Sequence, residues 1–151
     1  MRAVVQRVSR ASVSVSGTIV SEIGHGLLVL VGVTEGDSKQ DADALAAKIA
    51  GLRVFGDVEG KMNLALDDVG GAVLVVSQFT LYGSVRKGRR PSFTGAAHPD
   101  VARPIVERVI ARLREADLDV GSGRFGELMA VELVNDGPLT FVIDVRDGSV
   151  R

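Results

Sequence analysis

The sequence has 151 residues, of which 46% are hydrophobic and 25% are charged, and its formal net charge is −1. This size and composition are ordinary for one globular domain, and the near-neutral charge argues against a protein that coats nucleic acid through bulk electrostatics. There is no cysteine, which excludes disulfides, thiolate nucleophiles and zinc-thiolate sites and fits a reducing compartment.

The apolar runs of the sequence are short. The longest, residues 27–33, is well below the roughly 20 residues that a helix needs to cross a bilayer. The first ten residues, MRAVVQRVSR, lack the apolar stretch and cleavage site of a signal peptide. We therefore expect a cytoplasmic protein without a membrane partner.

Period-two alternation dominates the first third of the chain. Residues 12–16 alternate strictly, which places Val13 and Val15 on one face of a strand. After a break at Gly17, residues 18–23 alternate again, and the two glycines around His25 predict a turn. The continuously apolar run that follows is typical of a strand covered on both faces.

Two helices are predicted. The first begins after Asp37 or Ser38, either of which can cap it, and ends near Gly51. Its apolar face consists of Ala42, Leu45, Ile49 and Leu52. The second lies between about residues 99 and 116, where Val101, Ile105, Val109 and Leu113 repeat at every fourth position. Pro104 predicts a late start or a bend, because proline removes a helical hydrogen bond.

Four further strands are predicted, at residues 52–55, 73–76, 128–134 and 140–145. The elements together predict an α+β fold, with a single-domain strand-rich sheet or small barrel and about two packed helices. We expect one domain over residues 1–151, with residues 146–151 as a short C-terminal tail. Because such a fold supports many functions, function has to be inferred from sites.

No familiar catalytic or cofactor motif is present. The two histidines, His25 in a glycine turn and His98 at a helix start, are more simply explained as turn and cap residues than as a catalytic pair. No group of His, Asp and Glu has the spacing of metal ligands, and no glycine-rich nucleotide-binding loop is found. We therefore expect no metal and no cofactor.

Three stretches are locally unusual. SQFTLYG at 77–83 ends a valine-rich strand, and can be either a site at a strand end or a strand that runs into a polar loop. NDGPLT at 135–140 is explained by a simple turn. Between them lie four cations that are either a solvated surface or a rim for a phosphodiester chain, namely Arg86, Lys87, Arg89 and Arg90.

In combination, several motifs resemble the D-aminoacyl-tRNA deacylase family. They are QRV at 6–8 followed by ASV at 11–13, GKMN at 60–63, SQFTLYG at 77–83, RPSF at 90–93, GRF at 123–125 and VNDGPLTF at 134–141. Each is weak alone, but their order and spacing cover roughly residues 1–145.

The resemblance implies a homodimer that hydrolyses the ester between a D-amino acid, and also glycine, and tRNA. It implies that Ser77, Gln78, Phe79 and Thr80 form the pocket for the aminoacylated end of the tRNA. Gly137 and Pro138, joined by a cis peptide bond, enter the partner's pocket and exclude L-amino acids, supported by Arg7 and Asn135. The cations at positions 86, 87, 89 and 90 form the tRNA rim.

The resemblance also implies the catalytic roles. Phe79 and Thr80 act through their backbone and as pocket lining, and the 2′-hydroxyl of the tRNA assists the reaction. Two alternatives remain open from the residues, namely a noncatalytic tRNA-binding module and an esterase in which Thr80 is a covalent nucleophile.

Overall fold

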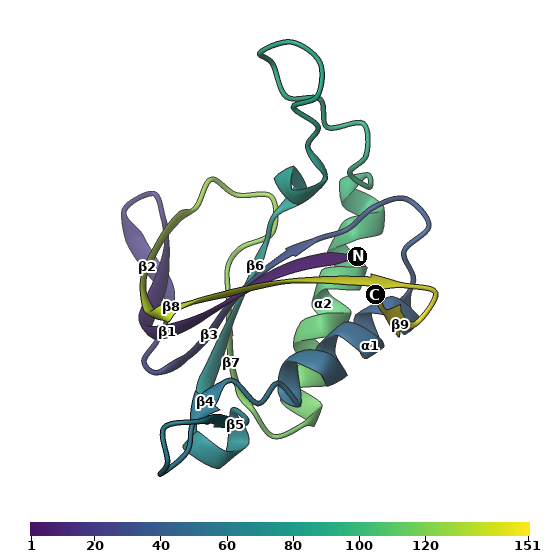
Figure 1. The fold of residues 1–151 in the computed structure, drawn as a ribbon. Helices are drawn as coiled ribbons and strands as arrows, with labels where there is room; N and C mark the ends of the chain where they lie inside the picture. Colours follow the sequence, from purple (N-terminus) through teal and green to yellow (C-terminus); the bar gives the residue numbers. More distant parts are fainter.

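The computed structural model describes all 151 residues as a curled mixed sheet, a half-barrel, packed against two helices (Figure 1). The strands of the main sheet are β1 (Arg2–Val15), β2 (Thr18–Ile23), β3 (Gly26–Gly32), β6 (Ala72–Ser77), β7 (Asp119–Ser122), β8 (Ala130–Arg146) and β9 (Ser149–Val150). Their order is β7-β6-β3-β1-β8-β9, with β2 paired to β1. β3, β6 and β7 are parallel, whereas β1 is antiparallel to β2, β3 and β8. The α+β class predicted from the sequence is confirmed.

The central strands are covered on both faces, as the sequence predicts. On one face, Leu27, Val29 and Val31 of β3 join a cluster of 26 buried residues that includes the helices. On the other face, Leu28 of β3 joins a second cluster of 8 buried residues with β1 and β6. Alternate residues of one strand thus serve two cores, which fixes the register of β3 against its neighbours.

The helices are α1 (Lys39–Ala50) and α2 (Pro99–Glu115). Ser38 caps α1 in a capping box with Asp41, and the predicted end at Gly51 is confirmed. α2 begins at Pro99 and continues through Pro104, so the predicted late start is wrong. Val101 is 40% exposed, and only the other three members of its predicted stripe are buried.

The segment between the last two predicted strands is not a hairpin turn. Residues 130–146 form one strand, β8, and both halves of it pair with β1 in the same direction. Asn135 pairs with Val8 and Thr140 with Gln6, so five steps along β8 correspond to two along β1. The excess residues bulge out of the sheet. The chain therefore does not reverse direction here, as a hairpin would require.

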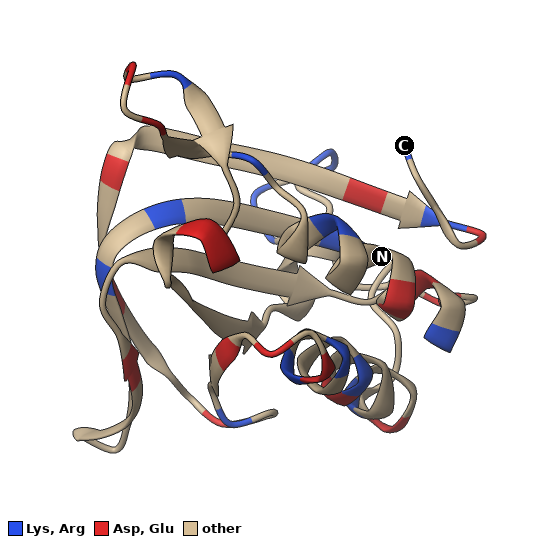
Figure 2. Ribbon diagram, turned by 90° about the horizontal axis from the view of Figure 1, so that it is seen from below, with Lys and Arg blue, Asp and Glu red and all other residues tan.

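The remaining elements are small. β4 (Phe55–Gly56) and β5 (Met62–Leu64) form a separate two-stranded sheet, so the predicted strand at 52–55 is displaced to its last residue. Short 3₁₀ helices cover Asp67–Val69 (η1) and Phe79–Tyr82 (η2). Neither of the two α-helices combines the length and the apolar character that crossing a membrane requires. Figure 2 shows cationic and acidic residues intermixed over the body of the molecule.

Candidate active site

The polar turn, residues 77–82, begins where β6 leaves the sheet. The Gln78 N–H donates to the Val31 carbonyl of β3 at 2.7 Å, and the chain then enters η2. The Gln78 amide nitrogen donates to the Thr80 hydroxyl at 2.5 Å. Because the first N–H groups of a helical turn have no acceptor within it, the backbone of Phe79 and Thr80 is suited to donate to a substrate oxygen.

Tyr82 closes the polar turn against the body of the protein. The Arg2 guanidinium lies 5.8 Å from its ring centroid and also forms an ion pair with Asp144, with 2.8 Å between Nε and Oδ1. Burial, together with the negative charges of Asp37 and Asp144, raises the pKa of Tyr82 to about 12. The tyrosine is therefore neutral at physiological pH and acts here as a packing group.

The Gly-Pro loop, residues 135–139, is the bulge in β8 and contains a cis bond between Gly137 and Pro138. The Asn135 side chain spans it. Its Oδ1 accepts from the Leu139 N–H at 2.8 Å, and its Nδ2 donates to the Leu139 carbonyl at 3.0 Å. Leu139 is only 8% exposed, so the loop is also anchored in the core.

Arg7 ties the Gly-Pro loop to a neighbouring element. Its Nε donates to the Asp136 carbonyl at 2.9 Å, and its Nη1 donates to the Val54 carbonyl. The position of this side chain follows from the register of the sheet, because Arg7 lies in β1 between Gln6 and Val8, which pair with the two residues that flank the bulge. Gly137 and Pro138 themselves are exposed, so the loop presents backbone atoms outward from a fixed base.

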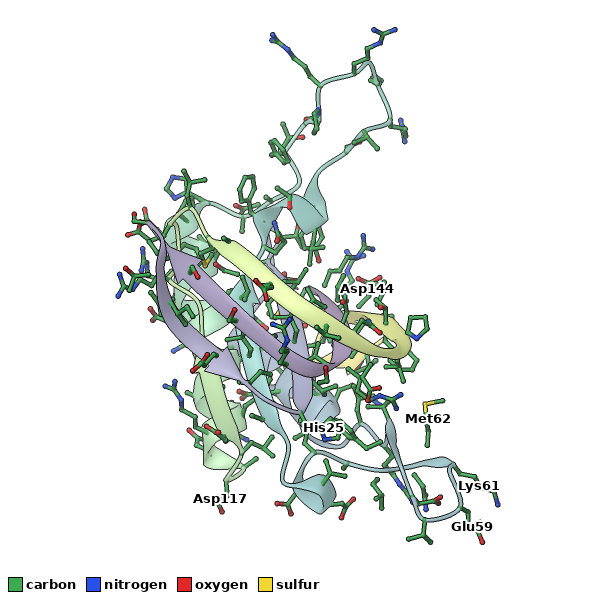
Figure 3. The ribbon with its side chains drawn as sticks, turned by 90° about the vertical axis from the view of Figure 1, so that its left-hand side faces the viewer. His25, Glu59, Lys61, Met62, Asp117 and Asp144 are labelled. Carbon is green, nitrogen blue, oxygen red and sulfur yellow. The ribbon has the colours of Figure 1, made fainter.

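A hollow of about 360 Å³ lies beside the Gly-Pro loop, and Arg7, His25, Phe55 and Met62 are among its lining residues. The His25 ring packs edge-on against Phe55 with 5.0 Å between ring centroids, and its Nε2 lies 4.0 Å from Asp136 Oδ2. Figure 3 places His25 and Met62 at the end of the molecule that also carries Lys61, away from the projecting loop of residues 84–92 at the top of the view. His25 is thus a neighbour of the Gly-Pro loop, a contact the sequence alone did not suggest.

The polar turn and the Gly-Pro loop lie at different positions along β1, the first near its start and the second near its middle. Gln78 is bonded to Val31, which pairs with Ala3, whereas the loop is held at Arg7. Four residues of strand separate these positions, which is about 13 Å at 3.3 Å per residue. Residues 77–80 do not line the hollow beside the Gly-Pro loop. They do not line a larger hollow of about 630 Å³ either, which is lined by residues that include Tyr82 and Thr34. Within one chain the two motifs therefore do not form a common pocket.

The basic loop, residues 84–92, projects from the body next to the polar turn (Figure 1). Its base is closed by two backbone hydrogen bonds between Ser84 and Ser92, of 2.7 and 2.9 Å. Its four cations, Arg86, Lys87, Arg89 and Arg90, are all exposed, and none lies within 4.0 Å of an acidic group. Uncompensated cations on a projecting loop are well placed to contact phosphates.

The structure thus brings some predicted residues together and separates others. Ser77 to Thr80 lie beside the base of the loop that carries the four cations, and Arg7 and Asn135 both bind backbone atoms of the Gly-Pro loop. Sequence reasoning missed His25 and the aromatic contact of Phe79 with Phe93, whose ring centroids are 5.0 Å apart. His98 caps α2, accepting from the Asp100 N–H at 3.4 Å, as a cap residue is expected to do.

The chain is similar to known proteins in family, sequence and structure. The family described as D-Tyr-tRNA(Tyr) deacylase matches residues 4–144. A D-aminoacyl-tRNA deacylase from Chloroflexus aurantiacus is 59% identical over 95% of this chain and 90% of the relative. One from Heliobacterium modesticaldum is 57% identical over 98% of this chain and 99% of the relative.

Two solved structures resemble the fold. One, described as a c-Myc DNA unwinding element binding protein, has a TM-score of 0.88 and 39% identity, covering 95% of this chain and 98% of its own. Another, described as a probable eukaryotic D-amino acid tRNA deacylase, has a TM-score of 0.77, covering 93% of this chain and 97% of its own. At 20% identity, the second likeness concerns the fold alone.

Proposed function

The chain belongs to the D-aminoacyl-tRNA deacylase family, and we propose that it hydrolyses the ester bond between a D-amino acid and tRNA in a pocket shared by two copies of the chain. The 59% identity to a D-aminoacyl-tRNA deacylase over 95% of the chain supports the enzyme class, a hydrolase acting on aminoacyl-tRNA. Removing D-amino acids from tRNA is a chiral proofreading step in translation.

The separation of the two motifs supports the shared pocket. The Gly-Pro loop lies about 13 Å along β1 from the polar turn of the same chain. In a two-fold dimer each loop can meet the partner's turn, and the same contact then forms twice. The arrangement thus gives two equivalent sites, each completed by the other copy.

Exclusion of L-amino acids is assigned to Gly137 and Pro138 of the second copy. Both residues are exposed, whereas Arg7, Asn135 and Leu139 hold the ends of their loop. A backbone wedge held in this way rejects a side chain by its direction and not by its chemistry. One pocket then serves many D-amino acids, and it also accepts glycine, which has no side chain to exclude.

The chemistry assigned to the polar turn is positioning and electrostatic stabilisation. An aminoacyl ester is already activated, so a placed water and backbone N–H donors supply much of the catalysis. The Thr80 hydroxyl contacts the Gln78 amide at 2.5 Å, a group that cannot take its proton. We therefore assign Thr80 to the lining of the pocket, and we assign assistance of the ester hydrolysis to the 2′-hydroxyl of the terminal ribose.

The basic loop is assigned to the tRNA backbone. Its four cations have no acidic partner and lie on a loop that projects from the body beside the polar turn, which suits a polyanion that runs away from the pocket. The description of the 39% identical structure as a DNA element binding protein favours one alternative, a nucleic-acid-binding module without catalysis. Both functions use the same loop and differ in turnover.

The test is to incubate the purified protein with D-Tyr-tRNA and L-Tyr-tRNA, with and without EDTA, and to follow deacylation. We expect rapid hydrolysis of the D-form, sparing of the L-form and no effect of EDTA. Equal rates on the two enantiomers would contradict the wedge. Binding of tRNA without turnover would favour the noncatalytic alternative, and loss of activity in EDTA would show that a metal takes part.

A further inference from the structure

Two phenylalanine rings lie together on the surface between the polar turn and the basic loop. Phe79 is 57% exposed and Phe93 is 40% exposed, and their rings meet at 67° with centroids 5.0 Å apart. Neither phenylalanine is a member of either buried cluster. The chain has only five phenylalanines and one tyrosine, so this pair is a substantial share of its aromatic surface. Exposed paired rings of this kind mark an interaction site.

The pair is held in a defined position. Phe93 directly follows Ser92, which is bonded to Ser84 at the base of the basic loop. A β-carbon added at Gly83 would come within 3.0 Å of the Phe93 ring, so the ring lies directly over this glycine. The Phe93 carbonyl accepts from the Ala96 N–H at 3.0 Å. The aromatic surface is therefore in place before any ligand binds.

The cations of the basic loop suggest what covers the rings. Arg86, Lys87, Arg89 and Arg90 begin within two residues of the Ser84–Ser92 bridge, and a loop of this length extends about 10 Å beyond it. Aromatic rings beside unpaired cations are the pattern by which proteins hold single-stranded nucleic acid, with bases stacked on the rings and phosphates on the cations. An apolar peptide would leave the four cations without partners.

We propose that Phe79 and Phe93 form a stacking platform for the unpaired base that precedes the aminoacylated nucleotide of an RNA 3′ end. This inference rests on the proposed function, in which the polar turn holds the terminal nucleotide. Phe79 belongs to that turn and Phe93 lies on its basic-loop side, so the next base along the strand reaches the rings. The phosphates beyond it then reach the cations.

The test compares Phe93→Leu with Phe93→Tyr and with Leu128→Ala, using deacylation of D-Tyr-tRNA. Leucine keeps an apolar group over Gly83 but removes the π-face, whereas tyrosine keeps the π-face. Leu128 is 95% exposed and lies outside the polar turn and both loops, so it controls for the loss of an exposed apolar side chain elsewhere. We expect Phe93→Leu to raise KM about tenfold with little change in kcat, and Phe93→Tyr and Leu128→Ala to leave KM within about twofold of the unchanged chain.

A second comparison changes the substrate. The penalty of Phe93→Leu should fall towards one when the penultimate nucleotide of the tRNA is abasic, because the base that stacks is then missing. An equal penalty of Phe93→Leu on both substrates, or no penalty on either, would overturn the proposal. A shift of Phe93→Leu from dimer to monomer in light scattering would also overturn it, because the ring would then belong to a contact between copies.

A binding measurement separates this proposal from the proposed function. Fluorescence anisotropy with a labelled RNA hairpin that ends in four unpaired nucleotides requires no turnover. If the unchanged chain fails to hydrolyse D-Tyr-tRNA but Phe93→Leu weakens hairpin binding about tenfold, the catalytic assignment fails and the platform stands. If hydrolysis is normal and Phe93→Leu binds as the unchanged chain does, the platform fails and the catalytic assignment stands.

Discussion

The Gly-Pro loop and the basic loop are both exposed, but they are built in different ways. Side chains of β1 and β8 hold the Gly-Pro loop, through Arg7, Asn135 and the buried Leu139. The basic loop is closed only at its base, by the Ser84–Ser92 bridge, and its cations contact no acid. The first design suits the exclusion of a group by fixed backbone atoms, and the second suits contact with a flexible polyanion. Chiral selectivity and tRNA affinity should therefore be separable by mutation.

The largest effect is expected from Gly137→Ala. A β-carbon at this position would lie 2.6 Å from the Leu139 backbone nitrogen, so the loop must move. A displacement of about 1 Å in a positioning element costs roughly 100-fold, and we expect the ratio of D- to L-Tyr-tRNA hydrolysis to fall by about that factor. Gly17→Ala is the matched control, because Gly17 has a φ of +79° in a turn with open space around it. An unchanged ratio in Gly137→Ala would contradict the exclusion of L-amino acids by the Gly-Pro loop.

A smaller effect is expected from Asn135→Ala, which leaves the Leu139 N–H and carbonyl without their partner. An unsatisfied buried group costs about 1–3 kcal/mol, so the midpoint of thermal unfolding should fall and the D to L ratio should drop about tenfold. Asn135→Asp keeps the Oδ1 acceptor for the Leu139 N–H and should retain more selectivity. If Asn135→Ala lost stability but kept its full selectivity, the contacts of Asn135 with Leu139 would be irrelevant to selectivity.

Substitutions in the basic loop should change KM and its salt dependence and not the D to L ratio. Arg89→Ala should raise KM a few-fold and reduce the slope of log KM against log salt by about one, with the D to L ratio unchanged. Lys48→Ala, at an exposed cation in the last turn of α1, should change neither quantity. A change in the D to L ratio of Arg89→Ala would show that the two loops are not separable.

The smallest effect is expected from Thr80→Ala. The hydroxyl is an exposed acceptor for Gln78, and such a bond contributes about 0.5 kcal/mol, which is roughly a twofold to threefold change in rate. Replacing the terminal 2′-hydroxyl of the tRNA with hydrogen should instead nearly abolish the reaction. Detection by mass spectrometry of an acyl group bound to Thr80 would show that Thr80 is a nucleophile and would contradict its assignment as a lining residue.

Local signals predicted the scaffold well, whereas pairing between distant residues decided the site. Ser38 as a cap and β3 as a doubly covered strand follow from nearby residues alone. The composition of residues 135–138 suits a turn and a bulge equally. Only the pairing of Asn135 with Val8 and Thr140 with Gln6 distinguishes them. The approach of His25 to Asp136 depends on the same non-local register.

The sequence singled out the motifs at 77–80 and 137–138 but did not indicate how far apart they lie. Nothing in residues 77–80 or 137–138 indicates that they lie about 13 Å apart along β1. That distance depends on the order of β1, β3 and β6 in the sheet. The prediction that Val101 belongs to the buried face of its helix is wrong for a related reason. A repeat at every fourth residue does not show where the helix extends beyond its neighbours.

The most direct test of the shared pocket uses the absence of cysteine in the chain. In a Thr80→Cys, Asp136→Cys double variant, the two thiols of one chain are too far apart to bond, because a disulfide needs Cα atoms within about 7 Å. Mild oxidation should therefore give a covalently linked dimer on a non-reducing denaturing gel, while either single variant stays at the size of one chain. A double variant that remains unlinked, or that forms a bond within one chain, would contradict a pocket completed by the second copy.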